Sequence, residues 1–233
     1  MYIYGKNVVK SALESNTKIN KIFLSKSFDD QDILNGLKKT NLKFNIRQNY
    51  EMDKMVDAMH QGVILDVEDY KYADLSVLDN LEDALIVMLD HIEDPHNFGA
   101  IIRTCEAAGV DAIIIPKDRA CDVNSTVIKT STGTINNMNI IRVTNLNQTI
   151  KYLKDNGYWI VGTDMEGTDY SKIDYKGKTC IIIGNEGKGI SELVEKNCDF
   201  IASIPMYGKV NSLNASVATA IVIFEAVKAR HEL

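Results

Sequence analysis

Hydrophobic and polar residues alternate along the first 70 residues in a way that predicts a small α/β unit. Short runs with a two-residue apolar period are typical of half-buried strands, and an apolar residue at every third or fourth position is typical of an amphipathic helix. The expected strands are residues 21–25, 43–47 and 62–68, and the expected helices are residues 7–15, 30–39 and 50–59.

A second α/β series begins near residue 84, and its strands are continuously apolar. The expected strands are residues 84–89, 112–115, 139–143, 159–163, 180–183 and 200–204, with helices at 98–109 and 215–230. Buried strands separated by helices predict a mainly parallel sheet that is covered on both faces. Ligands of such sheets bind beyond the carboxyl ends of the strands, so the loops that follow the strands are the candidate site.

Residues 69–83, between the two series, are acidic, rich in turn formers and only weakly periodic. We therefore expect one domain at residues 1–70, a linker at 71–83 and a second domain at 84–233.

Composition narrows the class of protein. With 45% hydrophobic residues, the 233-residue chain can fill a real core. No apolar run approaches the roughly 20 residues that cross a bilayer, and the first residues do not resemble a signal peptide. The four cysteines lie far apart, without a C-x-x-C pair. We expect them to be small core residues in a cytoplasmic protein and to form neither zinc sites nor disulfides.

The net charge of -6 argues against a simple nucleic-acid coat protein, which would carry a basic excess. The first 54 residues nevertheless contain ten basic and six acidic residues, a local charge of about +4. This basic N-terminal segment would suit contact with phosphates. Lysines scattered over a solvated surface would explain it equally well.

The first informative loop, D-P-H-N-F-G-A-I-I-R at residues 94–103, follows a strand and opens a helix. Asn97 is placed to cap that helix. Arg103 lies on the face opposite the apolar stripe, with Gly99 one turn before it, which leaves room for a phosphate. An exposed ion pair between Arg103 and Glu106 is the alternative role.

The second loop, at residues 181–191, reads I-I-I-G-N-E-G-K-G-I-S. It matches neither the P-loop nor the dinucleotide fingerprint, but its glycines allow the backbone to approach a ligand closely. A carboxylate at Glu186 would repel a phosphate and fits a cationic ligand better. A purely structural turn that opens a helix is the alternative.

The third loop, at residues 204–216, reads I-P-M-Y-G-K-V-N-S-L-N-A-S and runs into a helix that is apolar nearly all round. Ser212 or Asn214 is expected to cap this helix, and capping alone would explain either residue. The helix has too much apolar surface to be half exposed, so it is buried either in the domain or in a dimer interface.

Together and in this order, the three loops resemble the three motifs of the SpoU family of RNA ribose 2′-O-methyltransferases. The opening Y-G-K-N-V-V at residues 4–9 is similar to the start of that family's small substrate-binding domain, which resembles ribosomal protein L30e. The resemblance implies a catalytic domain with a parallel sheet and a deep C-terminal trefoil knot, although chains generally avoid knots. It also implies a homodimer. The sequence has no cluster of His, Cys or carboxylate ligands at metal spacing, so we expect the cofactor to bind without a metal.

Family members bind S-adenosylmethionine largely through backbone groups. Matching the motifs residue by residue implies that the cofactor site contains Gly184, Ile204, Met206 and Leu213, with Thr163 as a weaker candidate. The catalytic positions implied in the same way are Asn97, Arg103, Glu186, Ser212 and Asn214. An arginine guanidinium stays protonated, so we expect Arg103 to hold an RNA phosphate and orient the hydroxyl rather than act as a base.

The resemblance therefore implies an S-adenosylmethionine-dependent RNA (guanosine-2′-O-)-methyltransferase. Its two-domain layout looks most like the bacterial enzymes that modify a guanosine of 23S rRNA, and tRNA stays open as the substrate. Two other readings are a non-catalytic RNA-binding protein of the same fold and an unrelated nucleotide-binding α/β protein. The presence of Arg103, Asn185 and Asn214 argues against the first, and the missing phosphate-loop signatures argue against the second.

Overall fold

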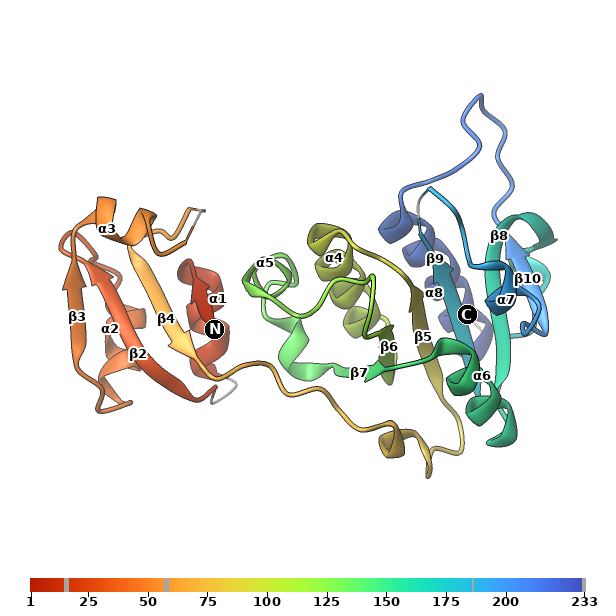
Figure 1. Ribbon diagram of the computed structural model, residues 1–233, viewed down its shortest axis with the longest axis horizontal. Helices are drawn as coiled ribbons and strands as arrows, with labels where there is room; N and C mark the ends of the chain where they lie inside the picture. The colour runs from red at the N-terminus through yellow and green to blue at the C-terminus, as the bar shows by residue number, and fades with distance from the viewer. Residues whose placement is uncertain (15–16, 57–58, 186, 232–233) are drawn as a thin grey trace. The chain divides into compact units, whose positions relative to one another are not determined.

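The computed structural model describes residues 1–14, 17–56, 59–185 and 187–231, and these form two compact units (Figure 1). The first unit contains Met1–Lys71 together with Val123–Asn136. The second contains Tyr72–Asp122 and Asn137–Leu233. The sequence did not indicate that the segment Val123–Asn136 clusters with the first unit.

The first unit is built on a four-stranded sheet in the order β1-β4-β2-β3. Strand β4 is antiparallel to both of its neighbours, and β2 is parallel to β3. The strands are β1 (Tyr2–Tyr4), β2 (Ile19–Ser25), β3 (Phe44–Arg47) and β4 (Val63–Val67). The helices are α1 (Lys6–Glu14), α2 (Gln31–Lys38), α3 (Asn49–Asp53) and α5 (Ser125–Thr130).

One helix of the first unit is much shorter than expected. The predicted helix 50–59 is wrong, because α3 ends at Asp53 and Met59 is not helical. The buried His60 ring explains the turn: its Nδ1 accepts from the Gly62 N–H at 2.9 Å, and its Nε2 lies 3.0 Å from Asp53 Oδ1. Residues 57 and 58 of the predicted helix, and residue 15 of another, lie outside the described residues.

The second unit contains a six-stranded, fully parallel sheet in the order β10-β8-β9-β5-β6-β7, which confirms the predicted class. The strands are β5 (Leu85–Asp90), β6 (Ala112–Pro116), β7 (Asn139–Val143), β8 (Trp159–Asp169), β9 (Thr179–Gly184) and β10 (Phe200–Ser203). All six residues of β5 are buried, as expected for a strand covered on both faces.

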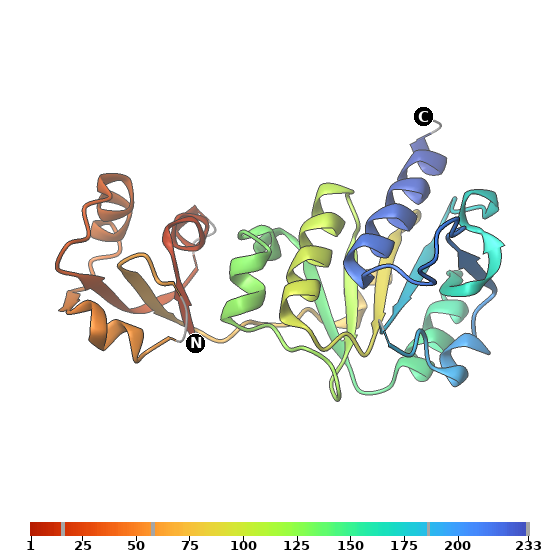
Figure 2. The ribbon, with the colours of Figure 1, turned by 90° about the horizontal axis from the view of Figure 1, so that it is seen from above.

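The helices of the second unit cover its sheet on both faces. Figure 2 shows α4 (Pro95–Ala107) and α8 (Ala215–His231) side by side on one face, and these two helices pack against each other. Helices α6 (Leu146–Asp155) and α7 (Glu192–Glu195) are in contact with each other, and α6 packs on β8. No helix among the described residues is long and apolar enough to cross a membrane. The trefoil knot stays a prediction.

The segment between the sheets is held against the second unit. The Ala73 N–H donates to the Ile140 carbonyl at 2.8 Å, and Leu78 in the short 3-10 helix Leu75–Leu78 is only 1% exposed. These residues therefore contribute to the core of the second unit as well as connecting the two sheets.

Helix α4 begins three residues earlier than expected. Its cap is Asp94, whose carboxylate accepts from the His96 N–H at 2.9 Å, so the prediction that Asn97 caps this helix is wrong. The reason is Pro95. Proline suits the first helical position and holds the preceding residue in an extended conformation, and Asp94 has φ -76° and ψ 119°.

Strand β8 is six residues longer than expected and contains an irregularity. It pairs with β10 from Val161 to Gly162 and again from Thr168 to Asp169, so residues 163–167 are looped out of the ladder. A bulge of this kind redirects side chains and is common beside functional sites. Its first three residues face the pocket described below.

Candidate active site

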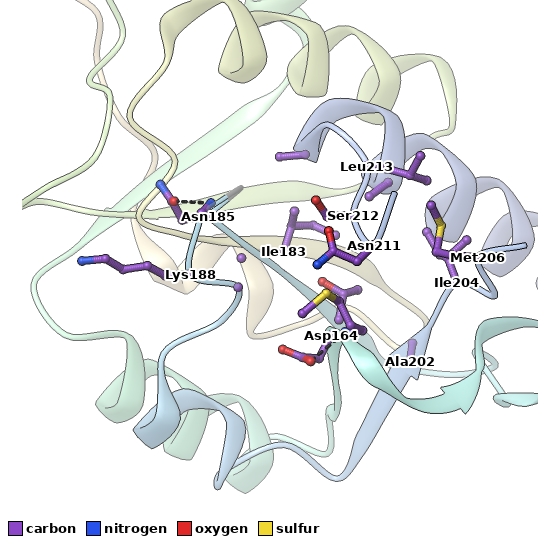
Figure 3. A pocket seen from close by; sticks show the side chains of 17 residues that line it. Asp164, Ile183, Asn185, Lys188, Ala202, Ile204, Met206, Asn211, Ser212 and Leu213 are labelled. Atoms are coloured by element: carbon purple, nitrogen blue, oxygen red, sulfur yellow. Dashed lines mark hydrogen bonds between the residues drawn. The ribbon is translucent and has the colours of Figure 1, made fainter. Parts of the chain in front are cut away.

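The candidate site is a pocket in the second unit, where β9 and β10 end and β8 bulges (Figure 3). Its volume is about 340 Å³, within the usual range for small-molecule sites. The second and third sequence loops and the bulge meet here. The lining residues are Thr163, Asp164, Met165, Ile183, Gly184, Asn185, Gly187, Lys188, Gly189, Ala202, Ile204, Met206, Asn211, Ser212, Leu213, Ala215 and Ala218.

The glycine-rich loop doubles back tightly on the end of β9. The Asn185 N–H donates to the Gly189 carbonyl at 3.0 Å, and the Gly189 N–H donates to the Asn185 carbonyl at 2.8 Å. The turn brings Gly184 very close to the backbone of Gly189 and Ile190. A Cβ on Gly184 would lie 2.2 Å from the Gly189 carbonyl carbon and 2.3 Å from the Ile190 nitrogen. Only glycine leaves room for this approach.

The end of β5 anchors the same loop from the side. Asp90 is 1% exposed, and its Oδ2 accepts from the Ser191 N–H at 2.6 Å. The Asn185 side-chain amide donates to the His91 carbonyl at 3.0 Å, and the His91 ring is hydrogen-bonded to Asp90. The glycine-rich loop, which forms part of the pocket wall, is therefore tied to the end of β5.

The third loop is joined to the first motif through two asparagines. Asn214 caps α8, because its Oδ1 accepts from the Ser216 N–H at 3.0 Å. Its side-chain amide donates to Asn97 Oδ1 at 2.9 Å, and Asn97 is 8% exposed. The expected capping role of Asn214 is confirmed. Ser212, the other candidate cap, lines the pocket instead.

Arg103 lies on α4 with its side chain exposed and is not one of the residues that line the pocket. Within the described part of the chain it forms no ion pair, so the alternative pairing with Glu106 is not made. The Glu106 carboxylate accepts instead from the Asn137 side chain at 3.3 Å. The guanidinium is available to an external partner.

The structure brings most of the predicted site residues together. Six of them line the one pocket: Thr163, Gly184, Ile204, Met206, Ser212 and Leu213. Asn97 and Asn214 do not line the pocket, but their side chains are hydrogen-bonded to each other, and Asn214 directly follows the pocket residue Leu213. Arg103 lies apart on the surface of α4, and Glu186 lies outside the described residues. The roles of these residues in binding and catalysis stay predictions.

Sequence reasoning missed two charged residues of the pocket, Asp164 and Lys188. Lys188 stands inside the glycine-rich motif, which was interpreted through its glycines. Asp164 directly follows Thr163, a weaker candidate, and lies beyond the point where β8 was expected to end. A carboxylate just after an apolar strand was the available signal for Asp164.

The cysteines contribute to the core rather than to chemistry. Cys105, Cys121 and Cys180 are buried, and all four cysteines are free thiols. Burial raises the pKa of the Cys105 and Cys180 thiols, and it raises the pKa of Cys198 to about 12. A thiol in this state offers no nucleophilic thiolate near neutral pH. Among the described residues there is no group of histidines, cysteines and carboxylates that could hold a metal ion.

Comparison with known protein families matches both parts of the chain. The model of the SpoU rRNA Methylase family matches residues 84–224, which include the whole pocket. A second model, described as RNA 2′-O ribose methyltransferase substrate binding, matches residues 2–73.

Individual relatives agree with these matches. The chain is 44% identical to a Staphylococcus saprophyticus protein assigned to the TrmH family of tRNA/rRNA methyltransferases, over 98% of this chain and 96% of that protein. It is similar to the SpoU methyltransferase AviRb from Streptomyces viridochromogenes in complex with AdoMet, with a TM-score of 0.85, 25% identity and coverage of 100% and 91%. An AdoMet-bound rRNA methyltransferase from Sinorhizobium meliloti gives a TM-score of 0.85, 28% identity and coverage of 100% and 87%.

The close approach at Gly184 can be tested by Gly184→Ala. We expect this substitution to destabilise the fold by about 1–3 kcal/mol, because the added methyl group collides with backbone that cannot move aside cheaply. The melting temperature, measured by calorimetry, should fall by several degrees. Gly208→Ala is the matched control, since a Cβ there meets nothing within 4 Å. Equal melting temperatures for the two variants would contradict the tight packing of this loop.

Proposed function

The chain belongs to the SpoU rRNA methylase family of RNA methyltransferases, and on that premise we propose that it methylates a ribose 2′-hydroxyl in RNA, that of a guanosine in 23S rRNA. The observation that carries the proposal is the convergence of the second and third motifs on one pocket at the ends of parallel strands, with the first motif joined to the third by the hydrogen bond from Asn214 to Asn97. The relatives are named as tRNA/rRNA methyltransferases, so tRNA is the alternative substrate.

The pocket fits S-adenosylmethionine, the cofactor of this family. Gly184 lines the pocket, and the lack of a side chain there leaves the backbone groups open to a ligand. Apolar side chains of Ile204, Met206 and Leu213 offer a wall for an adenine ring. We propose that these residues, together with Thr163, hold the cofactor, which supplies an electrophilic methyl sulfonium when bound.

A ribose hydroxyl is a poor nucleophile until it is oriented and loses its proton. We propose that Arg103 holds the RNA phosphate and orients this hydroxyl. Its guanidinium is exposed and stays protonated, which suits phosphate binding and not proton abstraction. The phosphate oxygen that it holds is the proposed proton acceptor.

The remaining polar positions are proposed to shape the site around Arg103. The hydrogen bond from Asn214 to Asn97 joins the first turns of α8 and α4, so it fixes the helix that carries Arg103 relative to the third loop. Ser212 lines the pocket, and we propose that it contacts the nucleotide. We assign Glu186 to the same catalytic group from its place in the second motif.

We propose that residues 1–70 select and hold the RNA and that residues 84–233 catalyse, with residues 71–83 as the connection. Two observations support this division. The substrate-binding family model matches residues 2–73, and the first 54 residues contain the local basic excess. We further propose that the enzyme acts in the cytoplasm, where its RNA substrate is made.

We propose that the enzyme is a homodimer with α8 in the interface. Val217 and Phe224, seven residues apart on one face of α8, are 48% and 49% exposed. An apolar helix face of this kind is typical of an interface between copies of a chain.

The catalytic proposal is tested by single-turnover methyl transfer to ribosomal RNA with saturating cofactor. Arg103→Ala should lower the rate on the order of 10²-fold or more, because phosphate binding and hydroxyl orientation are both lost. Arg103→Lys should recover little, since it lacks the planar fork. Both variants should have the melting temperature of the wild-type protein, because the side chain of Arg103 is exposed. Lys151→Ala, which removes an exposed cation from α6, is the control and should keep full activity. A near-normal rate in folded Arg103→Ala would remove Arg103 from the mechanism.

The dimer is tested by light scattering. The wild-type protein should have about twice the 26.0 kDa mass of the chain, and Phe224→Glu should shift it toward a single chain by placing a charge in an apolar interface. Leu193→Glu, at a residue of α7 that is 60% exposed, is the control and should stay dimeric. A fully active wild-type monomer at micromolar concentration would contradict the proposal.

A further inference from the structure

Two charged side chains stand among the described residues that line the pocket: Asp164 is the one carboxylate and Lys188 the one cation. Neither belongs to the set of residues proposed above to hold the cofactor. S-adenosylmethionine itself carries three charges, a positive sulfonium, a positive ammonium and a negative carboxylate. Each charged side chain in the pocket could therefore pair with a cofactor group of opposite charge.

The carboxylate of Asp164 is held in one orientation by its own strand. It belongs to the looped-out part of β8, and its Oδ1 accepts from the Met165 N–H at 2.7 Å and the Glu166 N–H at 3.3 Å. Its Oδ2 lies beside Gly189, 3.1 Å from the position that a Cβ would take there. Within the described residues, Oδ2 accepts no hydrogen bond. The bulge therefore presents a fixed negative charge with one oxygen available to a ligand.

The pocket is polar at one end and apolar at the other, as Figure 3 shows. Ile204, Met206 and Leu213 lie on one side, Lys188 lies on the other, and Asp164 lies between them in this view. The cofactor has the same order of groups: a flat adenosine, then the sulfonium, then the methionine tail with its carboxylate. An adenosine on the apolar side places the sulfonium in the middle, on the side of Asp164.

We propose that Asp164 is the countercharge for the sulfonium and gives the pocket a preference for S-adenosylmethionine over S-adenosylhomocysteine. This inference rests on the proposed function. In methyl transfer the ribose oxygen forms a bond to the methyl carbon while the sulfur–methyl bond breaks. The sulfur keeps the electron pair and becomes a neutral thioether, and the hydroxyl proton passes to the acceptor. Asp164 then faces no positive sulfur, so the product is held less tightly than the cofactor.

The test is a set of calorimetric titrations of the full chain with three ligands. S-adenosylmethionine and S-adenosylhomocysteine differ by the methyl group and the sulfonium charge. Sinefungin carries a protonated amine in place of the methyl sulfonium, so it keeps the charge without the reactive methyl. Asp164→Asn is the central variant, because the amide oxygen can still accept from the Met165 and Glu166 N–H groups. Asp164→Ser is the second variant in case the first one does not fold.

Asp164→Asn should weaken S-adenosylmethionine and sinefungin on the order of tenfold, the scale of one charge-assisted contact in a partly exposed site. The product should be weakened less than about threefold, because it has no charge at the sulfur. Glu166→Gln is the matched control. It removes a carboxylate two residues along the same strand that is exposed and does not line the pocket, so all three affinities should be unchanged.

Unchanged affinities in Asp164→Asn, or an equal loss for all three ligands, would overturn the inference. An equal loss of affinity for all three ligands would mean that Asp164 shapes the pocket and does not interact with the positive charge of the ligand. Failure of the wild-type protein to bind S-adenosylmethionine would instead refute the proposed function itself, so the two failures are distinguishable.

Discussion

The close approach of Gly184 to the Gly189–Ile190 backbone is the constraint on which the rest of the site depends. It brings the glycine-rich loop across the end of β9, where the loop becomes a wall of the pocket. The buried carboxylate of Asp90 then secures the loop through the Ser191 N–H. Because these contacts are made within the protein, the pocket is preorganised, and little binding free energy is lost to ordering it.

Contacts within the protein also fix the residues around the pocket. One asparagine, Asn214, both caps α8 and bonds to Asn97 in α4, so the two helices that cover one face of the sheet are fixed at their first turns. Arg103 is carried on the outer face of α4, away from that packing. The packing of α4 therefore does not involve the Arg103 side chain, which allows the arginine to be changed without loss of the fold.

Much of this architecture could be predicted from the sequence, because buried parallel strands are continuous apolar runs. Strand β7 was predicted to the residue, and the parallel class is confirmed. Local interactions explain the failures: Pro95 occupies the first position of α4, so its cap is Asp94, and the polar extension of β8 gains its strand character from pairing with β10. Five predicted pocket residues lie in the motifs and Thr163 lies outside them, but Asp164 was not predicted, because its position depends on a bulge formed with a distant strand.

The most direct test of the central claim is nucleoside mass spectrometry of ribosomal and transfer RNA from a strain that lacks this gene. We expect one 2′-O-methylguanosine of 23S rRNA to disappear and to return with the wild-type gene but not with Arg103→Ala. Loss of a ribose methyl group from tRNA would keep the reaction and change the substrate. Full retention of every ribose methylation, or loss of a methyl group from a base, would contradict the claim.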